Sequence, residues 1–187
     1  LIENVSVHVD VTNVWASGSN TGGLAGQITG NSIVNNSSET GDVTASATAG
    51  LSTAGFVGYL GDSSLQNCFA SGAVSGYHRV AGFVGEIGGA TNISGSYTLG
   101  EVTGVNNNIG GFIGYSWGVS TVVNSFYTGN VSGNDRVGGF VGDAGSNPAQ
   151  VYTNNYSTGT VTAMAGNYGG FVGYEAGPTF TNNFWNS

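Results

Sequence analysis

The 187-residue chain carries little charge, and almost none of it is positive. It has no lysine and only two arginines, Arg79 and Arg136, against ten acidic residues, so its formal net charge is −8 and charged residues make up 6% of it. Phosphate groups and anionic lipid surfaces are recognised largely through Lys and Arg. We therefore expect neither nucleic acid nor an anionic membrane surface as a partner.

Cysteine, proline and long apolar runs are also scarce. A single cysteine, Cys68, excludes an internal disulfide and a cysteine-based zinc site. Two prolines against 35 glycines exclude a collagen-like triplet repeat. No run of 18 apolar residues is present, so we expect no membrane insertion. Helices are also disfavoured, because apolar residues never recur at helical spacing and each glycine costs a helix about 1 kcal/mol relative to alanine.

What the chain has instead is a repeated four-residue motif, in which two apolar residues stand between two glycines. Its first glycines are separated by 32, 27, 29, 28 and 31 residues, a mean period of roughly 29. The six copies are Gly23-Leu24-Ala25-Gly26, Gly55-Phe56-Val57-Gly58, Gly82-Phe83-Val84-Gly85, Gly111-Phe112-Ile113-Gly114, Gly139-Phe140-Val141-Gly142 and Gly170-Phe171-Val172-Gly173. A repeat of this length is typical of a solenoid.

Two further strand-like pieces recur in each repeat. One alternates apolar and polar residues around an asparagine and ends on an aromatic, as in Val122 to Phe126; the other reads Gly-x-Val-Ser/Thr, as in Gly129 to Ser132. The sequence thus predicts an all-β fold, a parallel β-solenoid of about six rungs with roughly 28–30 residues and three short strands per rung. We treat residues 1–187 as one array: a partial first rung at 1–21, then rungs that begin near 22, 54, 81, 110, 138 and 169, the last incomplete.

Stacked rungs place equivalent residues in columns. We expect two internal aromatic columns and one asparagine column whose amides bond along the stack, on the same face as Leu65 and Phe69. The flanking glycines are expected at corners, where a positive φ or a close backbone approach excludes a Cβ. The first aromatic column is Leu24, Phe56, Phe83, Phe112, Phe140 and Phe171; the second is Phe69, Tyr97, Phe126, Tyr156 and Phe184; the asparagines are Asn4, Asn35, Asn67, Asn124, Asn154 and Asn182.

At these residues the chain resembles a known repeat family. Gly139 to Gly142 and Asn124 to Gly133 are similar to the GLUG repeat, named for its Gly-Leu-any-Gly core, and the similarity extends over essentially the whole chain. That repeat occurs in tandem in large secreted or cell-surface proteins of bacteria and archaea, including adhesin-like proteins. The resemblance implies an extracellular, structural or adhesive module, and it carries no catalytic residues with it.

The candidate chemical groups do not form a recognisable site. The position of Asp10 and Asp42 is filled by Ala73, Glu101, Asn130 and Thr160 in the other repeats, as expected of a solvent-facing residue rather than a catalytic carboxylate. His8 and His78 lie far apart in the repeat, and Asp135 is expected to pair with its neighbour Arg136. We predict no enzyme and no cofactor, with a calcium ion held by oxygen-rich surface loops as the alternative.

Two other binding functions stay open at this stage. A column of hydroxyls suggests ice binding on a flat Ser/Thr-rich face, although the neighbouring position of Asp10 and Asp42 is irregular. The same face, or the variable loops at Thr44 to Ala54 and Ser146 to Gln150, would serve a glycan-binding solenoid. The hydroxyl column is Thr12, Thr44, Ser75, Thr103, Ser132 and Thr162.

The function we predict is a non-enzymatic structural or adhesive module of an extracellular surface protein. Its partners would be the other domains of that longer protein, further copies bound end to end in a filament, and an undetermined host or environmental glycan or protein. The chain begins in mid-repeat at Leu1 without a Met, which we interpret as a mature or excised fragment that lacks its targeting segment.

Overall fold

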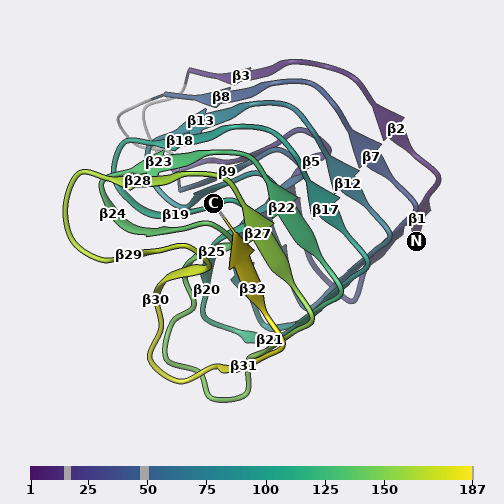
Figure 1. Cartoon of the computed structure of the whole chain (residues 1–187). Coiled ribbons are helices and arrows are strands. Elements are labelled where there is room, and N and C mark those ends of the chain that lie inside the picture. The colour runs from purple at the N-terminus through teal and green to yellow at the C-terminus, as the bar shows by residue number, and fades with distance from the viewer. Residues whose placement is uncertain (15–17, 47–50, 187) are drawn as a thin grey trace.

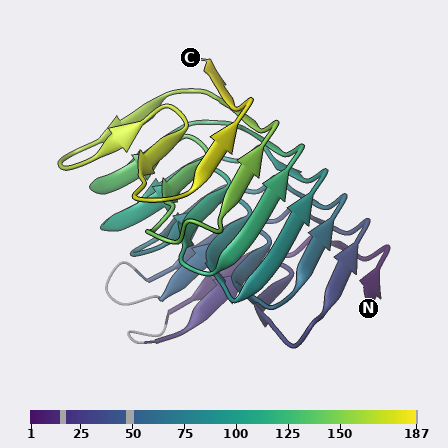
Figure 2. The same cartoon turned by 90° about the horizontal axis from the view of Figure 1, so that it is seen from below.

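A computed structural model describes residues 1–14, 18–46 and 51–186. These residues form 32 short strands and no helix, so none of them lies in a helix long enough to cross a membrane. The chain winds repeatedly through the same path, and its two ends lie at opposite ends of the stack (Figure 1, Figure 2). Part of the loop expected between Thr44 and Ala54, namely 47–50, lies outside the described residues.

Each turn contributes one strand to each of five parallel sheets, so the expectation of three strands per turn was too low. Sheet A contains β1 (Ile2–Glu3), β6 (Ile33–Asn35), β11 (Ser64–Gln66), β16 (Ala90–Ser94), β21 (Val119–Val123), β26 (Val151–Thr153) and β31 (Thr179–Thr181). Sheet B contains β2 (Ser6–Val7), β7 (Ser38–Glu39), β12 (Phe69–Ala70), β17 (Tyr97–Thr98), β22 (Phe126–Thr128), β27 (Tyr156–Thr158) and β32 (Phe184–Asn186).

The other three sheets have six strands each. Sheet C contains β3 (Val11–Asn13), β8 (Val43–Ala45), β13 (Val74–Gly76), β18 (Val102–Gly104), β23 (Val131–Gly133) and β28 (Val161–Ala163). Sheet D contains β4 (Asn20–Gly22), β9 (Ser52–Ala54), β14 (Val80–Ala81), β19 (Asn107–Gly110), β24 (Asp135–Gly138) and β29 (Tyr168–Gly169). Sheet E contains β5 (Ala25–Ile28), β10 (Val57–Gly61), β15 (Val84–Gly88), β20 (Ile113–Ser116), β25 (Val141–Asp143) and β30 (Val172–Tyr174).

The all-β parallel β-solenoid of about six turns is confirmed by this topology. Each strand pairs with the equivalent strand of the turn before and after it, as Val57 pairs with Val84 and Val84 with Ile113. The extra strands arise because the glycine motif spans a sharp bend. Its first glycine and the Phe lie between sheets D and E, and the chain folds inward there (Figure 1). The strand-like sequence on either side therefore belongs to two sheets.

The phenylalanines of the motif form the centre of the core. Phe56, Phe83, Phe112 and Phe140 are 0% exposed, and their rings stack with centroids 4.6 to 4.9 Å apart. Phe171 continues the stack in the last turn and is only partly buried, as is Leu24 in the first. Each ring therefore fills the space above the ring of the preceding turn, with an aromatic contact favourable by about 0.5–1.5 kcal/mol beyond burial.

The second aromatic column is not internal, which corrects the sequence-based expectation. Phe69, Tyr97, Phe126 and Tyr156 stack at 4.8 to 5.1 Å on the outside of sheet B, half-buried in the middle turns and 41% exposed at Tyr156. Phe184, in the last turn, is 67% exposed. The reason is the corner that precedes them: the asparagine lies at a turn, so the alternation counted from Leu65 does not continue through it.

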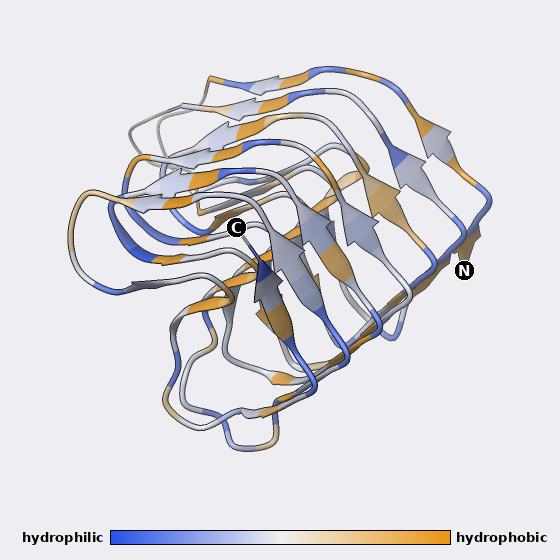
Figure 3. Cartoon of the chain, in the orientation of Figure 1, coloured by the Kyte–Doolittle hydropathy of each residue, from blue (hydrophilic) through white to orange (hydrophobic). Residues whose placement is uncertain are grey.

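The asparagine column lies at the corner between sheets A and B, which is hydrophilic in Figure 3. Its backbone is left-handed, with φ between 49° and 59°, a conformation that Asn and Gly tolerate best. The column consists of Asn4, Asn36, Asn67, Gly95, Asn124, Asn154 and Asn182. Asn36 replaces Asn35, which pairs in sheet A with Glu3 and Gln66, so the expected register of that turn was wrong by one residue.

These asparagines face solvent and not the core. The Nδ2 of Asn154 donates to Oδ1 of Asn124 at 3.3 Å, and Asn182 donates to Asn154 at the same distance, so the amides do form a ladder. Of the two alternatives expected at the motif glycines, a positive φ is found here, at the asparagine corner. The motif glycines have ordinary φ values among the described residues, and their role is close approach between turns.

Glu39 is an acidic side chain buried against this core. Glu39 in β7 is 0% exposed; its Oε1 accepts the Gly41 N–H at 2.5 Å, and its Oε2 has no hydrogen-bond partner among the described residues. Burial, and to a smaller extent the nearby Asp42 and Asp10 carboxylates, raise the pKa of this carboxyl from 4.5 to about 7. An acid with a raised pKa destabilises the folded protein when it ionises.

This burial predicts a specific dependence of stability on pH. Below pH 4.5 the carboxyl is protonated in both states; between pH 4.5 and about 7 the unfolded chain ionises first, so the free energy of unfolding falls as pH rises. We expect this group to remove about 3 kcal/mol between pH 4 and pH 8. Urea unfolding of Glu39→Gln should lose this component, whereas exposed Glu101→Gln should retain it. Equal pH profiles for wild type and Glu39→Gln would contradict the assignment.

Candidate functional site

Two columns of polar and aromatic side chains meet where sheets D and E adjoin. On sheet E, tyrosines alternate with acids from one turn to the next; on sheet D, arginines alternate with small polar residues. The sheet E column is Gln27, Tyr59, Glu86, Tyr115, Asp143 and Tyr174. The sheet D column begins with the paired Asn20 and Ser52 and continues with the residues that directly precede the paired Val80, Ile109, Val137 and Tyr168, namely Arg79, Asn108, Arg136 and Asn167. Each arginine thus lies in the same turn as an acid.

Glu86 is the centre of the first polar cluster. Its Oε2 accepts hydrogen bonds from Nη1 of Arg79 at 2.6 Å and from Oγ of Ser52 at 2.9 Å, while its Oε1 accepts the indole N–H of Trp117 at 2.9 Å. The Arg79 guanidinium also lies 5.2 Å from the ring centre of Tyr115 in the next turn. The Glu86 carboxylate is buried, and Arg79 balances its charge. It also orients the indole ring of Trp117 in the next turn.

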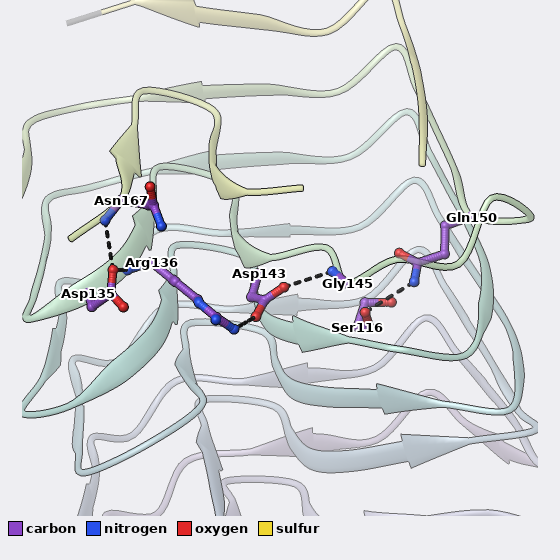
Figure 4. A network of polar contacts seen from close by, with 7 residues as sticks. All are labelled: Ser116, Asp135, Arg136, Asp143, Gly145, Gln150 and Asn167. Carbon is purple, nitrogen blue, oxygen red and sulfur yellow. Dashed lines mark hydrogen bonds and ion pairs between the residues drawn. The ribbon is translucent and has the colours of Figure 1, made fainter. Parts of the chain in front are cut away.

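Asp143 occupies the equivalent place in the second cluster, shown in Figure 4. Its Oδ2 accepts from Nη1 of Arg136 at 2.5 Å, and its Oδ1 accepts the Gly145 N–H at 2.7 Å. The Arg136 guanidinium lies 4.7 Å from the centre of the Tyr174 ring. The hydrogen bond that Arg136 donates to Asp143 raises the pKa of this arginine further, so it stays charged. The two clusters are therefore copies of one arrangement.

The expected pairing of Asp135 with the side chain of Arg136 is not found. Asp135 Oδ1 accepts the backbone N–H groups of Arg136 at 2.8 Å and of Asn167 at 2.7 Å (Figure 4). Arg136 has a left-handed backbone, with φ of 52°, which turns its side chain toward Asp143 on the adjoining sheet. Adjacency in sequence did not decide the pairing, because the backbone conformation sends the two side chains in different directions.

The loop that follows β25 is tied to the preceding turn. Gln150, fully buried, donates from Nε2 to the Ser116 carbonyl at 3.1 Å (Figure 4). Its Oε1 accepts a hydrogen bond from the Tyr152 hydroxyl at 3.2 Å. At the tip, Nδ2 of Asn147 donates to the Trp117 carbonyl at 3.4 Å. This insertion, expected from Ser146 to Gln150, is thus held in a defined position beside the columns.

The two side-chain columns and the insertion loop border an open groove of about 320 Å³. Its walls are the aromatic rings of two turns, the Arg136–Asp143 pair and the tip of the insertion loop. Trp117 is 47% exposed and Tyr174 is 37% exposed, so the groove presents aromatic surface that the core does not use. The lining residues are Tyr115, Trp117, Arg136, Asp143, Ser146, Asn147 and Tyr174, together with Gly145.

Sequence reasoning missed this groove although part of its signal was visible. Arg79 and Arg136 recur at matching positions, and each pairs with an acid seven residues later, Glu86 or Asp143. The alternation of tyrosine and acid on sheet E spans two repeats, so comparison of single repeats does not reveal it. A search for a period of two repeats would have found it.

The acids weighed for catalysis have a structural role. Asp10 Oδ1 accepts the Asp42 N–H at 2.9 Å, and Asp42 Oδ1 accepts the Ala73 N–H at 2.8 Å. Each carboxylate thus accepts a hydrogen bond from a backbone N–H group of the next turn. His8 contacts Thr40 at 2.7 Å, and burial lowers the pKa of His78. Asp10 and Asp42 stand in adjacent turns, and in the described residues these acids and histidines form no group of three or more suited to a metal ion.

Four members of the hydroxyl column line a hollow rather than a flat surface. Thr12, Thr44, Ser75 and Thr103 line a hollow of about 440 Å³ on sheet C, although neighbouring hydroxyls contact each other, as Ser75 and Thr44 do at 3.3 Å. Ice binding requires a flat, regular array, so this geometry does not favour it. None of the described residues that line this hollow is aromatic.

No metal site is formed by the usual ligand side chains in the part of the chain that the structure describes. Residues 1–14, 18–46 and 51–186 bring together no group of three or more His, Cys, Asp or Glu side chains suited to a metal ion. A calcium ion held mainly by loop carbonyl and amide oxygens stays a prediction.

Comparison with protein families agrees with the repeat. The model of the GLUG motif matches residues 49–75, which include the motif Gly55 to Gly58 and the strands β9 to β12. The chain therefore contains a GLUG-repeat region, and the other turns stack in register with the matched turn. No curated protein and no solved structure gave a match.

Proposed function

We propose that this chain is a non-enzymatic structural and adhesive repeat module of an extracellular surface protein. It acts as a stiff segment that holds other domains of that protein away from the cell surface and displays its own grooves and loops to the environment. The observation that supports this role most directly is the unbroken pairing of every turn with the next in five parallel sheets. Such a stack resists bending because each bend must break backbone hydrogen bonds.

Composition supports the same role. With 6% charged residues and a net charge of −8, the module offers no broad basic surface for nucleic acid or anionic membranes. The open strand edges of the first and last turns permit further turns to pair, either from adjoining parts of the same protein or from another copy in a filament. An extracellular location follows from this surface role.

Stiffness is testable by measuring a distance along the stack. Spin labels at Thr12 and Thr162, which stand in the same column five turns apart, should lie about 24 Å apart with a narrow distribution by pulsed electron resonance. Labelling requires removal of the native thiol. Cys68→Ser suits this purpose because Ser96 and Ser125 occupy equivalent positions and donate to the carbonyl two residues before them, as Cys68 does.

The expected distribution is the same at low and high salt, because backbone hydrogen bonds and not surface charges hold the turns together. A broad distribution, or one that widens with salt, would overturn the stiff-segment proposal. A concentration series measured by light scattering on the unlabelled chain tests the filament: a constant monomer mass would remove self-association from the proposal.

A further inference from the structure

The groove between sheets D and E exposes aromatic rings that the fold does not require. The core aromatics of the middle turns, such as Phe83 and Phe112, are 0% exposed, whereas Trp117 is 47% and Tyr174 is 37% exposed. Large aromatic side chains at the surface carry most of the contact energy in binding sites, because each buries a wide apolar face at a low cost in conformational entropy. These rings are the strongest signal of a ligand in the described residues.

The indole ring of Trp117 is fixed before any ligand arrives. Its Nε1 donates to Oε1 of Glu86 at 2.9 Å, and the ring lies over Gly88, where an added Cβ would stand 2.6 Å from Cζ2. Asn147 binds the Trp117 carbonyl from the insertion loop. A ring whose only donor is already satisfied presents an apolar face, and a preorganised face loses little entropy on binding.

The charges of the groove are paired, which argues against a charged ligand. Arg79 is neutralised by Glu86 at 2.6 Å and Arg136 by Asp143 at 2.5 Å. Both Asp143 oxygens accept hydrogen bonds within the protein, so this acid is not free to hold a cation. What remains for a ligand is aromatic surface surrounded by guanidinium, amide and hydroxyl groups. That combination fits a neutral molecule with both C–H faces and hydroxyl groups.

The spacing of the rings indicates an extended ligand. Tyr59, Tyr115 and Tyr174 recur in every second turn, with Glu86 and Asp143 in the turns between them. Turns are about 4.8 Å apart, so successive tyrosines lie about 10 Å apart along the stack. An extended β-linked glycan advances by a comparable distance every two sugars, so alternate sugars can meet equivalent surroundings.

We propose that the groove lined by Trp117, Tyr115 and Tyr174 binds a neutral, extended oligosaccharide, with sugar faces on the indole ring and hydroxyl groups toward Arg136, Ser146 and Asn147. This inference rests on the adhesive part of the proposed function and names its ligand class. It does not depend on the stiffness of the module, so the distance measurement above and the binding measurement below can fail separately.

The experiment is calorimetric titration of the whole chain with cellohexaose and chitohexaose as neutral extended probes. We expect saturable binding of at least one probe to the wild type. Trp117→Ala and, separately, Tyr174→Ala should each weaken it by about tenfold, and Trp117→Phe should restore part of the loss. Maltohexaose, which is helical, should bind more weakly than the extended probes.

The matched control is Trp185→Ala. Trp185 is 46% exposed, nearly the same as Trp117, but it lies on sheet B and does not line the groove, so its removal should leave binding unchanged. Circular dichroism and urea unfolding show whether each variant is folded, and Trp117→Phe keeps the test informative if the alanine variant unfolds. Three outcomes would overturn the proposal. They are absence of binding to both extended probes, tighter binding of an anionic glycan such as heparin, and equal affinity of the two groove variants and Trp185→Ala.

Discussion

Replacement of Phe112 by alanine is expected to lower the free energy of unfolding by about 3–5 kcal/mol, the range for a buried aromatic truncated in a core. Phe112 is 0% exposed and stacks on Phe83 at 4.6 Å and on Phe140 at 4.7 Å. Its removal leaves a cavity that the backbones above and below cannot close, because hydrogen bonds between turns fix their spacing. Urea unfolding followed by circular dichroism measures the loss.

The matched comparison is Phe126→Ala, in the outer aromatic column of the same part of the stack. Phe126 is half-buried and has ring neighbours on both sides, Tyr97 at 4.8 Å and Tyr156 at 5.0 Å. Because its outer edge faces solvent, we expect a loss of about 1 kcal/mol. A Phe112→Ala loss no larger than that of Phe126→Ala would mean that the inner column does not hold the solenoid together.

Replacement of Gly111 by alanine is expected to cost about 3 kcal/mol or more, at the upper end for overpacking, even though only one methyl group is added. A Cβ at Gly111 would collide with the Gly139 carbonyl of the next turn and with the Tyr127 ring. The same geometry recurs at Gly82, where a Cβ would stand 2.6 Å from the Gly111 carbonyl. The Gly139 carbonyl belongs to the backbone of the next turn and cannot move without breaking sheet hydrogen bonds, so thermal and urea unfolding should both show the loss.

Gly30→Ala separates this close approach from the general cost of replacing a glycine. Gly30 has φ of 77°, and a Cβ there would meet nothing within 4 Å, so the only penalty is the left-handed backbone, about 1–2 kcal/mol. If the loss of stability in Gly111→Ala is as small as that in Gly30→Ala, the regular spacing of the turns does not depend on the motif glycines.

Both predictions rest on one property of stacked turns. Each turn is in contact only with its neighbours, so a defect in a middle turn weakens two interfaces while one in a terminal turn weakens a single interface. Phe171 and Leu24, at the two ends of the inner column, are only partly buried. Truncation there should consequently cost less than truncation of Phe112.

Much of the fold could be read from particular residues. The copies of Gly-Phe-Val-Gly at near-constant spacing predicted stacked turns and the inner phenylalanine column, because identical residues in successive turns can only come into register in a solenoid. The Asn-x-aromatic piece was harder to interpret. Alternation alone placed Asn67 and Phe69 on the face of Leu65, but Asn67 has φ of 52°, and this corner directs the aromatic outward. Local periodicity does not reveal a corner that interrupts it.

The sequence by itself thus determined the all-β class, the number of turns and the stacking of the motif phenylalanines, since these follow from the repeat and from the low content of charge and of helix-forming patterns. Only the tertiary structure decided which columns face the core, the one-residue register that places Asn36 at a corner, and the groove beside Trp117. The physical reason is that side-chain direction depends on the bends between sheets, and a groove depends on two sheets that meet at an angle. Neither is encoded within a single strand.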